Sequence, residues 1–183
     1  MISFIGFLVS LIASILFFLI NIWYFPIIFG SLVFIAGLLD GVDGVVARKT
    51  HKVTRFGGFF DSVLDRFSDS FLCLSFMKYF YLDIQLLFIP VYIWVFLAIL
   101  GSFLVSYSRS LAETCLGDYN CDIGLGARSE RLFILVVTSW FLIPYIGLII
   151  LTFVSFGTAI YRQYVYYKQM EKLENKQVNG SSG

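Results

Sequence analysis

The N-terminal stretch constrains this chain more than any other feature, because residues 1–39 contain no charged side chain. A membrane-spanning helix needs about 20 consecutive apolar residues, so this stretch predicts two such helices. We expect the break between them at 21–26, because Pro26 suits the first turn of a helix. Overall, 59% of the residues are hydrophobic and 14% are charged, about half the charged share of soluble domains. We therefore exclude a soluble globular enzyme and predict an all-α integral membrane protein.

The rest of the chain predicts three or four more helices. Residues 57–78 are apolar but carry three aspartates, and residues 84–108 are uncharged. Residues 132–161 are also uncharged and are broken at Pro144, so they could form one long tilted helix or a short helical hairpin. The hairpin gives a bundle of six transmembrane helices and the single helix gives five, and the basic residues decide between them.

The basic residues predict how the bundle lies in the membrane. With six helices and a cytoplasmic N-terminus, all of the 13 lysines and arginines except Lys78 fall at or near the cytoplasmic side, as the positive-inside rule requires. Five helices would send the basic C-terminal segment to the outside. We therefore expect both termini in the cytoplasm of a multi-pass cell-membrane protein, with a membrane domain at 1–172 and a flexible tail at 173–183. The net charge of +1 argues against a nucleic-acid partner.

Two pairs of aspartates indicate where chemistry takes place. Asp40 and Asp43 lie at the predicted end of the second helix, and Asp61 and Asp65 lie at the predicted start of the third. Residues three or four apart share a helix face, so adjacent helices can oppose their pairs. Carboxylates this close repel one another unless cations separate them, and such oxygen ligands suit magnesium or manganese. The structural alternative is a salt-bridge network with three nearby arginines: Arg48, Arg55 and Arg66.

The pattern around these aspartates resembles a known signature. Segment 40–48 reads Asp-Gly-Val-Asp-Gly-Val-Val-Ala-Arg, and eight residues later segment 57–65 reads Gly-Gly-Phe-Phe-Asp-Ser-Val-Leu-Asp. It is similar to the signature of the CDP-alcohol phosphotransferases at all eight fixed positions, namely Asp40, Asp43, Gly44, Ala47, Arg48, Gly57, Asp61 and Asp65. The resemblance implies a six-helix membrane enzyme that moves a substituted phosphate from a CDP-linked alcohol to an acceptor hydroxyl and releases CMP.

The same resemblance implies roles for individual residues. One or two magnesium or manganese ions, bridging the diphosphate, would be bound by Asp40, Asp43, Asp61 and Asp65. Asp65 would also take the proton from the acceptor hydroxyl as general base. Gly44 would let the cytidine approach closely, and Arg48 would contact the phosphates. Thr54 matches a position that contacts the nucleotide in relatives, and an ordinary loop threonine fits it equally well.

The second half of the chain bears on the acceptor. Segments 106–113, Ser-Tyr-Ser-Arg-Ser-Leu-Ala-Glu, and 126–132, Gly-Ala-Arg-Ser-Glu-Arg-Leu, resemble phosphatidylinositol phosphate synthases and archaetidylinositol phosphate synthases. This likeness implies a CDP-linked lipid as donor and inositol phosphate as acceptor. Basic positions of those enzymes match Arg109, Arg131 and Arg162, and guanidinium groups bind phosphate bidentately. Positive-inside anchoring is the alternative role for these arginines, and Arg128 and Glu113 could form a structural pair.

Other functions stay open at this point. The same reaction could use another acceptor, such as glycerol phosphate or serine, or could join CDP-inositol to inositol phosphate. A divalent metal transporter is disfavoured, because the aspartates cluster at one membrane edge and none lies near the middle of the last three helices. We expect the active site to face the cytoplasm, and a second copy of the chain is a candidate partner.

Overall fold

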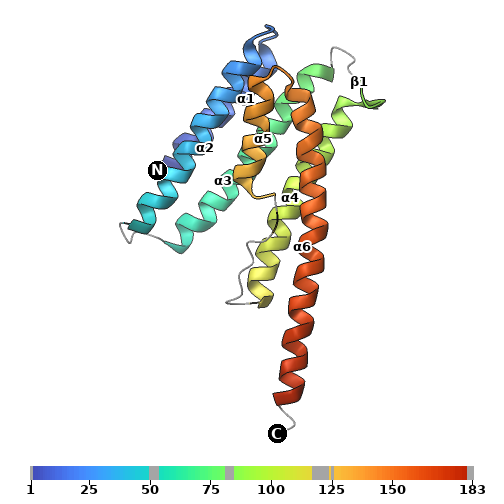
Figure 1. The fold of residues 1–183 in the computed structure, drawn as a ribbon. Coiled ribbons are helices and arrows are strands. Elements are labelled where there is room, and N and C mark those ends of the chain that lie inside the picture. The colour runs from blue at the N-terminus through green and yellow to red at the C-terminus, as the bar shows by residue number, and fades with distance from the viewer. Residues whose placement is uncertain (1, 50–53, 81–84, 117–123, 125, 181–183) are drawn as a thin grey trace.

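The structure is a computed structural model that describes residues 2–49, 54–80, 85–116, 124 and 126–180. Within these ranges only the backbone is described for residues 2, 43–48, 55, 79, 80, 116 and 174–180. Its elements in chain order are α1 (Ile2–Leu19), α2 (Phe25–Lys49), α3 (Arg55–Leu74), the 3-10 helix η1 (Ser75–Phe80), β1 (Gln85–Leu86), β2 (Ile89–Pro90), α4 (Val91–Leu116), α5 (Arg128–Trp140) and α6 (Pro144–Gly180). The described part is therefore an all-helical bundle with one short antiparallel hairpin (Figure 1).

The breaks between helices confirm two of the predictions. α1 and α2 are separated at residues 20–24, and Pro26 occupies the first turn of α2. α5 ends at Trp140, Leu142 adopts a positive φ of 61°, and Pro144 begins α6. The bonds of Leu142 N–H to Ser139 O and Ile143 N–H to Thr138 O close the end of α5. A single long helix through this region is thereby excluded.

The segment expected as a fourth helix at 84–108 begins differently. Gln85–Leu86 pairs with Ile89–Pro90, and the two turn residues Leu87 and Phe88 both have positive φ. Positive φ at both central positions is the geometry of a tight hairpin turn, and Pro90 cannot lie inside a helix. α4 therefore starts only at Val91, and it continues past 108 to Leu116. The indole of Trp94 donates to Leu86 O at 2.9 Å and holds the hairpin on the helix.

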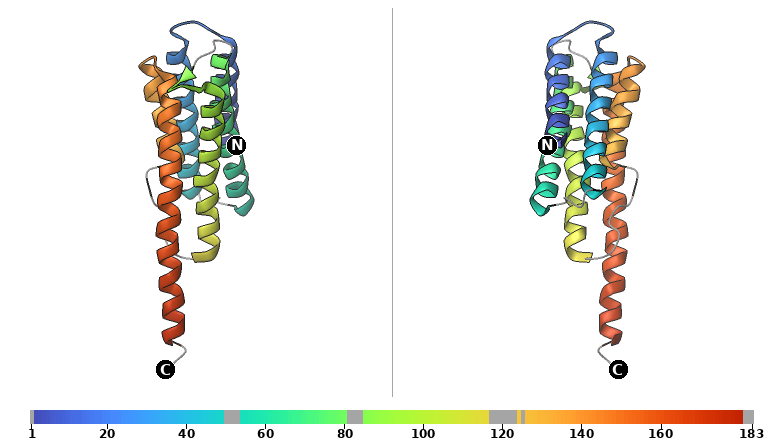
Figure 2. Two further views of the ribbon diagram at one scale, coloured as in Figure 1. Left: turned by 90° about the vertical axis from the view of Figure 1, so that its right-hand side faces the viewer. Right: turned by 90° about the vertical axis from the view of Figure 1, so that its left-hand side faces the viewer.

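The far ends of α3 and α6 also differ from the sequence-based boundaries. α3 ends at Leu74 and passes into the 3-10 helix η1, so the segment predicted as one helix at 57–78 has two parts. α6 continues to Gly180 and so extends into the region where a flexible tail was expected from 173 (Figure 2).

Three helices of the described chain are long and apolar enough to cross a membrane: Phe25–Val42 in α2, Val91–Cys115 in α4 and Pro144–Leu173 in α6. The apolar segment of α1, Ser3–Leu19, is slightly shorter. α5 has 13 residues and is therefore about 20 Å long. The six α-helices of the described chain are thus unequal in length.

The two ends of the bundle hold different connections and different side chains. The α1–α2 connection, the hairpin and the α5–α6 connection lie at one end, whereas the C-terminal end of α2 and the N-terminal end of α3 lie toward the other (Figure 1). At the first end the rings of Phe17 and Phe29 stack with centroids 4.2 Å apart, and Phe76 packs against both. All three side chains are fully buried. We call this region the aromatic end, and the region of Asp40 and Asp65 the site end.

Candidate active site

Three carboxylates meet at the site end. Asp40 comes from α2, and Asp61 and Asp65 come from one face of α3, four residues apart. One oxygen of each lies within 4.8 Å of the others. Asp43, Gly44 and Arg48 belong to the C-terminal part of α2, where the structure describes the backbone alone. Three of the four predicted ligands are therefore brought together, and the fourth stays a prediction.

The donor set of this cluster fits a hard divalent cation. The three groups are all carboxylates, which magnesium and manganese prefer over the softer ligands of zinc. Oδ1 of Asp61 is buried and has no hydrogen-bond partner in the described structure. A buried carboxylate oxygen without a partner carries a desolvation cost, which a cation at this position would offset.

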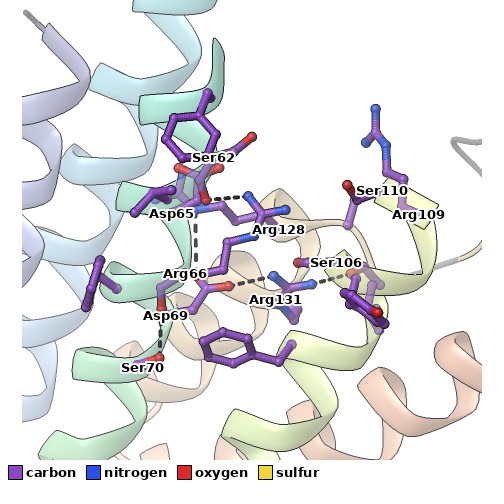
Figure 3. A pocket seen from close by; sticks show the side chains of 18 of the residues that line it. Ser62, Asp65, Arg66, Asp69, Ser70, Ser106, Arg109, Ser110, Arg128 and Arg131 are labelled. Carbon is purple, nitrogen blue, oxygen red and sulfur yellow. Dashed lines mark hydrogen bonds and ion pairs between the residues drawn. The ribbon is translucent and has the colours of Figure 1, made fainter. Parts of the chain in front are cut away.

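Arg128 lies against the cluster. Its Nη1 is 2.6 Å from Asp40 Oδ2 and 2.8 Å from Asp65 Oδ1, and its Nε is 3.6 Å from Asp69 Oδ1. The alternative in which Arg128 pairs with Glu113 is wrong, because Glu113 accepts from Arg109 Nε at 2.8 Å instead. A salt-bridge network therefore exists among these carboxylates, and its described arginines, Arg128 and Arg131, come from α5, a helix far from the aspartates in the sequence (Figure 3). The side chains of Arg48 and Arg55 lie outside the described part of the structure.

Asp69 is a site residue that the sequence reasoning left without a role. Its Oδ2 accepts from Arg131 Nη2 at 2.5 Å, while its Oδ1 faces Arg128. It is the third member of an i, i+4 series with Asp61 and Asp65, so it lies on the same face of α3. That spacing was the signal that could have identified it.

A cavity of about 860 Å³ adjoins the carboxylates between α3, α4 and the start of α5. Asp65 lines it together with all three arginines predicted to hold the acceptor phosphate: Arg109, Arg131 and Arg162. Arg66 and Arg128 line it as well, so five guanidinium groups border one space. Figure 3 shows Asp65 and Asp69 on α3 facing Arg128 and Arg131 across this region.

The three predicted arginines are held to different degrees. Arg131 is 4% exposed, and its Nη1 donates to Gly126 O at 2.7 Å while Nη2 donates to Asp69. Arg162 is 2% exposed and donates to Val105 O at 2.8 Å. Arg109 is exposed. Two of these cations are therefore fixed inside the protein, which anchoring to a membrane surface does not require.

Gly126 positions the start of α5 against α6. A Cβ at this residue would lie 2.6 Å from Thr158 Oγ1, so only glycine lets the two segments come this close. Glu130 accepts from the backbone N–H of Ala127 at 3.0 Å and holds the first turn of α5. These contacts fix the backbone from which Arg128 and Arg131 project.

Thr54 has a structural role in the first turn of α3. Its Oγ1 accepts from the backbone N–H of Gly57 at 3.0 Å, which makes it the N-cap of the helix. A Cβ on Gly57 would lie 2.9 Å from that oxygen, so the glycine makes room for the cap. The ordinary structural interpretation of Thr54 is thus supported, and a contact with nucleotide stays a prediction. Arg66, expected as a salt-bridge partner, donates instead to Ser62 O on its own helix.

Comparison with known proteins identifies the family. A sequence model described as CDP-alcohol phosphatidyltransferase matches residues 1–161. The chain belongs to this family. It is therefore an enzyme of the phosphotransferase class, and the resemblance in the aspartate motif is confirmed.

Individual relatives agree with this assignment. The chain is 37% identical over 167 residues to an archaetidylinositol phosphate synthase of Pyrococcus horikoshii, an alignment that covers 91% of this chain and 82% of the relative. Crystal structures of Mycobacterium tuberculosis phosphatidylinositol phosphate synthase share the fold. One has CDP-DAG bound, with a TM-score of 0.74 at 23% identity, covering 91% of this chain and 84% of the other. The second, in complex with manganese and citrate, has a TM-score of 0.72 at 22% identity and covers 91% and 80%.

Proposed function

We propose that this enzyme transfers a phosphatidyl-type group from a CDP-linked lipid, either CDP-diacylglycerol or CDP-archaeol, to inositol phosphate and releases CMP. One observation carries the proposal: Asp65 of the carboxylate cluster lines the same cavity as Arg109, Arg131 and Arg162. A reaction between a diphosphate and a phosphorylated alcohol needs both kinds of group in one space. The name of the Pyrococcus relative supports the choice of acceptor.

The carboxylates would handle the diphosphate. Magnesium or manganese, held by Asp40, Asp43, Asp61 and Asp65, would supply the positive charge that a diphosphate needs next to carboxylates. Asp65 lies between the cluster and the cavity, so it can accept the proton of the acceptor hydroxyl. The acceptor oxygen then bonds to the phosphorus that carries the lipid, the bond from that phosphorus to the CMP oxygen breaks, and CMP leaves.

The arginines would recognise the phosphate of the acceptor. Inositol phosphate carries a dianionic phosphomonoester, and guanidinium groups bind such oxygens with paired, charge-assisted hydrogen bonds. Arg131 and Arg162 are buried and fixed, so little side-chain entropy would be lost when they bind the phosphate. Arg109 would close the exposed side of the cavity.

The nucleotide would lie beside the end of α2 and the start of α3. Gly44, Arg48 and Thr54 belong to these two segments, and in the family signature such positions serve the cytidine and its phosphates. The cap that Thr54 makes on α3 leaves its side chain exposed at this edge.

The proposal includes an arrangement in the membrane. All six helices of the proposed membrane domain, 1–172, would cross the bilayer, with both termini and the site on the cytoplasmic side of the cell membrane. The arginines gather at the site end, and Lys78 lies at the aromatic end beside the ring of Phe17. Labelling of Lys52→Cys, with the native cysteines replaced, should occur from the cytoplasmic side alone, and labelling from outside would refute this orientation.

The test of the reaction is CMP release from CDP-diacylglycerol and CDP-archaeol with a panel of acceptors. Inositol phosphate should support turnover, whereas serine and unphosphorylated inositol should not, because they bring no phosphate for the arginines. Efficient turnover of serine or glycerol phosphate would refute inositol phosphate as the acceptor. The assignment of the chain as a phosphotransferase would still hold. CDP-inositol belongs in the same panel as the competing donor.

A further inference from the structure

Arg128 contacts two of the three carboxylates that would hold a divalent ion. The atoms concerned are Asp40 Oδ2 and Asp65 Oδ1, at 2.6 and 2.8 Å from the same guanidinium nitrogen. Both aspartates belong to the cluster whose oxygens lie within 4.8 Å of one another. The guanidinium of Arg128 thus already pairs with carboxylate groups that the proposed metal site needs.

A guanidinium at this position and a divalent ion oppose each other. An ion bound by Asp40 and Asp65 would lie within a few ångströms of Nη1, and like charges this close in a part-buried site repel strongly. We propose that Arg128 and the divalent ion compete for Asp40 and Asp65, so that metal binding moves the guanidinium from the carboxylates into the cavity. The inference rests on the metal site of the proposed function and adds a residue that controls it.

Arg128 is held in a way that permits this movement, and Arg131 is not. The partners of Arg128 in the described part of the structure are all carboxylates, and its side chain is 20% exposed and lines the cavity. Arg131 makes two short hydrogen bonds and is 4% exposed. The hydrogen bond that the Ala127 backbone N–H donates to the Glu130 carboxylate keeps the helix start in place while the side chain of Arg128 moves.

The movement would couple the metal to the acceptor. Once displaced, the guanidinium of Arg128 faces a cavity bordered by Arg109, Arg131 and Arg162 and can bind a phosphate there. A phosphate bound to Arg128 in the cavity would keep the guanidinium away from Asp40 and Asp65. The metal would then bind these two carboxylates without competition. Coupling between two ligands is reciprocal, so each must raise the affinity of the other by the same factor.

The experiment measures Mn²⁺ binding to the purified full chain by electron paramagnetic resonance at pH 8, without any lipid substrate. Arg128→Gln removes the competing charge and should tighten Mn²⁺ binding about tenfold or more, which corresponds to the loss of one charge-assisted hydrogen bond. Arg66→Gln is the matched control: it removes a charge that lines the same cavity but contacts the backbone oxygen of Ser62 rather than a carboxylate. It should change Mn²⁺ affinity less than about threefold, as expected for a screened charge.

A second titration tests the coupling. Saturating inositol phosphate should tighten Mn²⁺ binding in the wild type and have little effect in Arg128→Gln. Unchanged or weaker Mn²⁺ binding in Arg128→Gln, or an equal gain in Arg66→Gln, would overturn the competition. If Arg128→Gln does not fold, Arg128→Lys replaces it, because its single ammonium loses the fork geometry and should give a smaller gain of about threefold. No gain there would likewise overturn the proposal.

These outcomes are separate from the test of the reaction. Mn²⁺ affinity is measured without CDP-lipid, so it does not depend on which acceptor the enzyme uses. If the wild type releases CMP but Arg128→Gln does not bind Mn²⁺ more tightly, the proposed function stands and the competition is refuted. A chain that binds no Mn²⁺ at all loses both the metal site and the competition.

Discussion

The two ends of the bundle each hold buried positive charge, but in opposite ways. At the aromatic end Lys78 Nζ lies 3.4 Å from the centroid of the Phe17 ring, which stacks on Phe29. At the site end Arg128 and Arg131 are held by the carboxylates of Asp65 and Asp69, next to a cavity of about 860 Å³. Phe17, Phe29 and Phe76 pack against one another and are fully buried. Ion pairs beside a cavity leave groups that can exchange partners, which is what a catalytic site needs.

This difference predicts that changes at the site end alter turnover and leave folding largely intact. Changes at the aromatic end should lower stability and leave the kinetics of the folded enzyme largely intact.

The largest effect is expected for Asp65→Asn, which keeps the shape of the side chain and removes the proposed base. CMP release should fall at least about 1,000-fold, within the range that general-base catalysis supplies. Binding of CDP-lipid, measured directly by isothermal titration, should stay within severalfold of the wild type. A loss of binding that accounts for the whole defect would make Asp65 a ligand only.

Removing the metal should have a comparable effect at the same end. EDTA is expected to bring CMP release to background, and Mg²⁺ or Mn²⁺ should restore it, because the carboxylates alone repel a diphosphate. The thermal transition followed by circular dichroism should shift by only a few degrees, since the aromatic end does not contain the carboxylate cluster. Full activity after exhaustive chelation would refute the metal site.

A smaller effect is expected for Arg131→Ala. The acceptor KM should rise roughly 10- to 100-fold, because charged hydrogen bonds contribute about 1.5–3 kcal/mol each. The KM for CDP-lipid should change little. Since Asp69 would lose its 2.5 Å partner, Arg131→Lys serves as the matched variant that keeps a charge beside it. An unaltered KM for inositol phosphate in both variants would remove Arg131 from the acceptor site.

The sequence predicted the parts of this site that depend on local spacing. The i, i+3 and i, i+4 carboxylates follow from helix geometry, and the structure agrees for every such side chain that it describes. The helix break at Pro144 was predicted from the proline and from the distribution of basic residues, and α6 begins at that residue. The partner of Arg128 was missed because it depends on how α5 packs on α2 and α3, which lie about 60 to 90 residues away in the sequence. The hairpin at 85–90 was missed because its turn lacks the usual sequence signal. The two residues with positive φ are a leucine and a phenylalanine, whereas glycine or asparagine is typical of such a turn.

The aromatic end gives the converse prediction. Phe29→Ala would leave a void among Phe17 and Phe76, and truncation of a buried phenylalanine costs about 3 kcal/mol or more. The melting temperature in detergent should therefore fall by several degrees, while the acceptor KM of the folded enzyme stays within about twofold. A large change in KM without a loss of stability would show that the two ends are not independent.

The smallest effect is expected at Thr54, which caps α3 near the carboxylate cluster. Thr54→Ala removes the N-cap of α3 and should cost about 1 kcal/mol of stability. Thr54→Asn keeps a capping oxygen and should restore that stability, although it replaces the hydroxyl. If Thr54 acts only through the cap, both the melting temperature and the KM for CDP-lipid return to wild-type values in Thr54→Asn. If the hydroxyl also contacts the nucleotide, stability returns and the KM does not. Because the asparagine variant separates the two properties, this pair of measurements decides whether the cap residue belongs to the scaffold of α3 or to the nucleotide site.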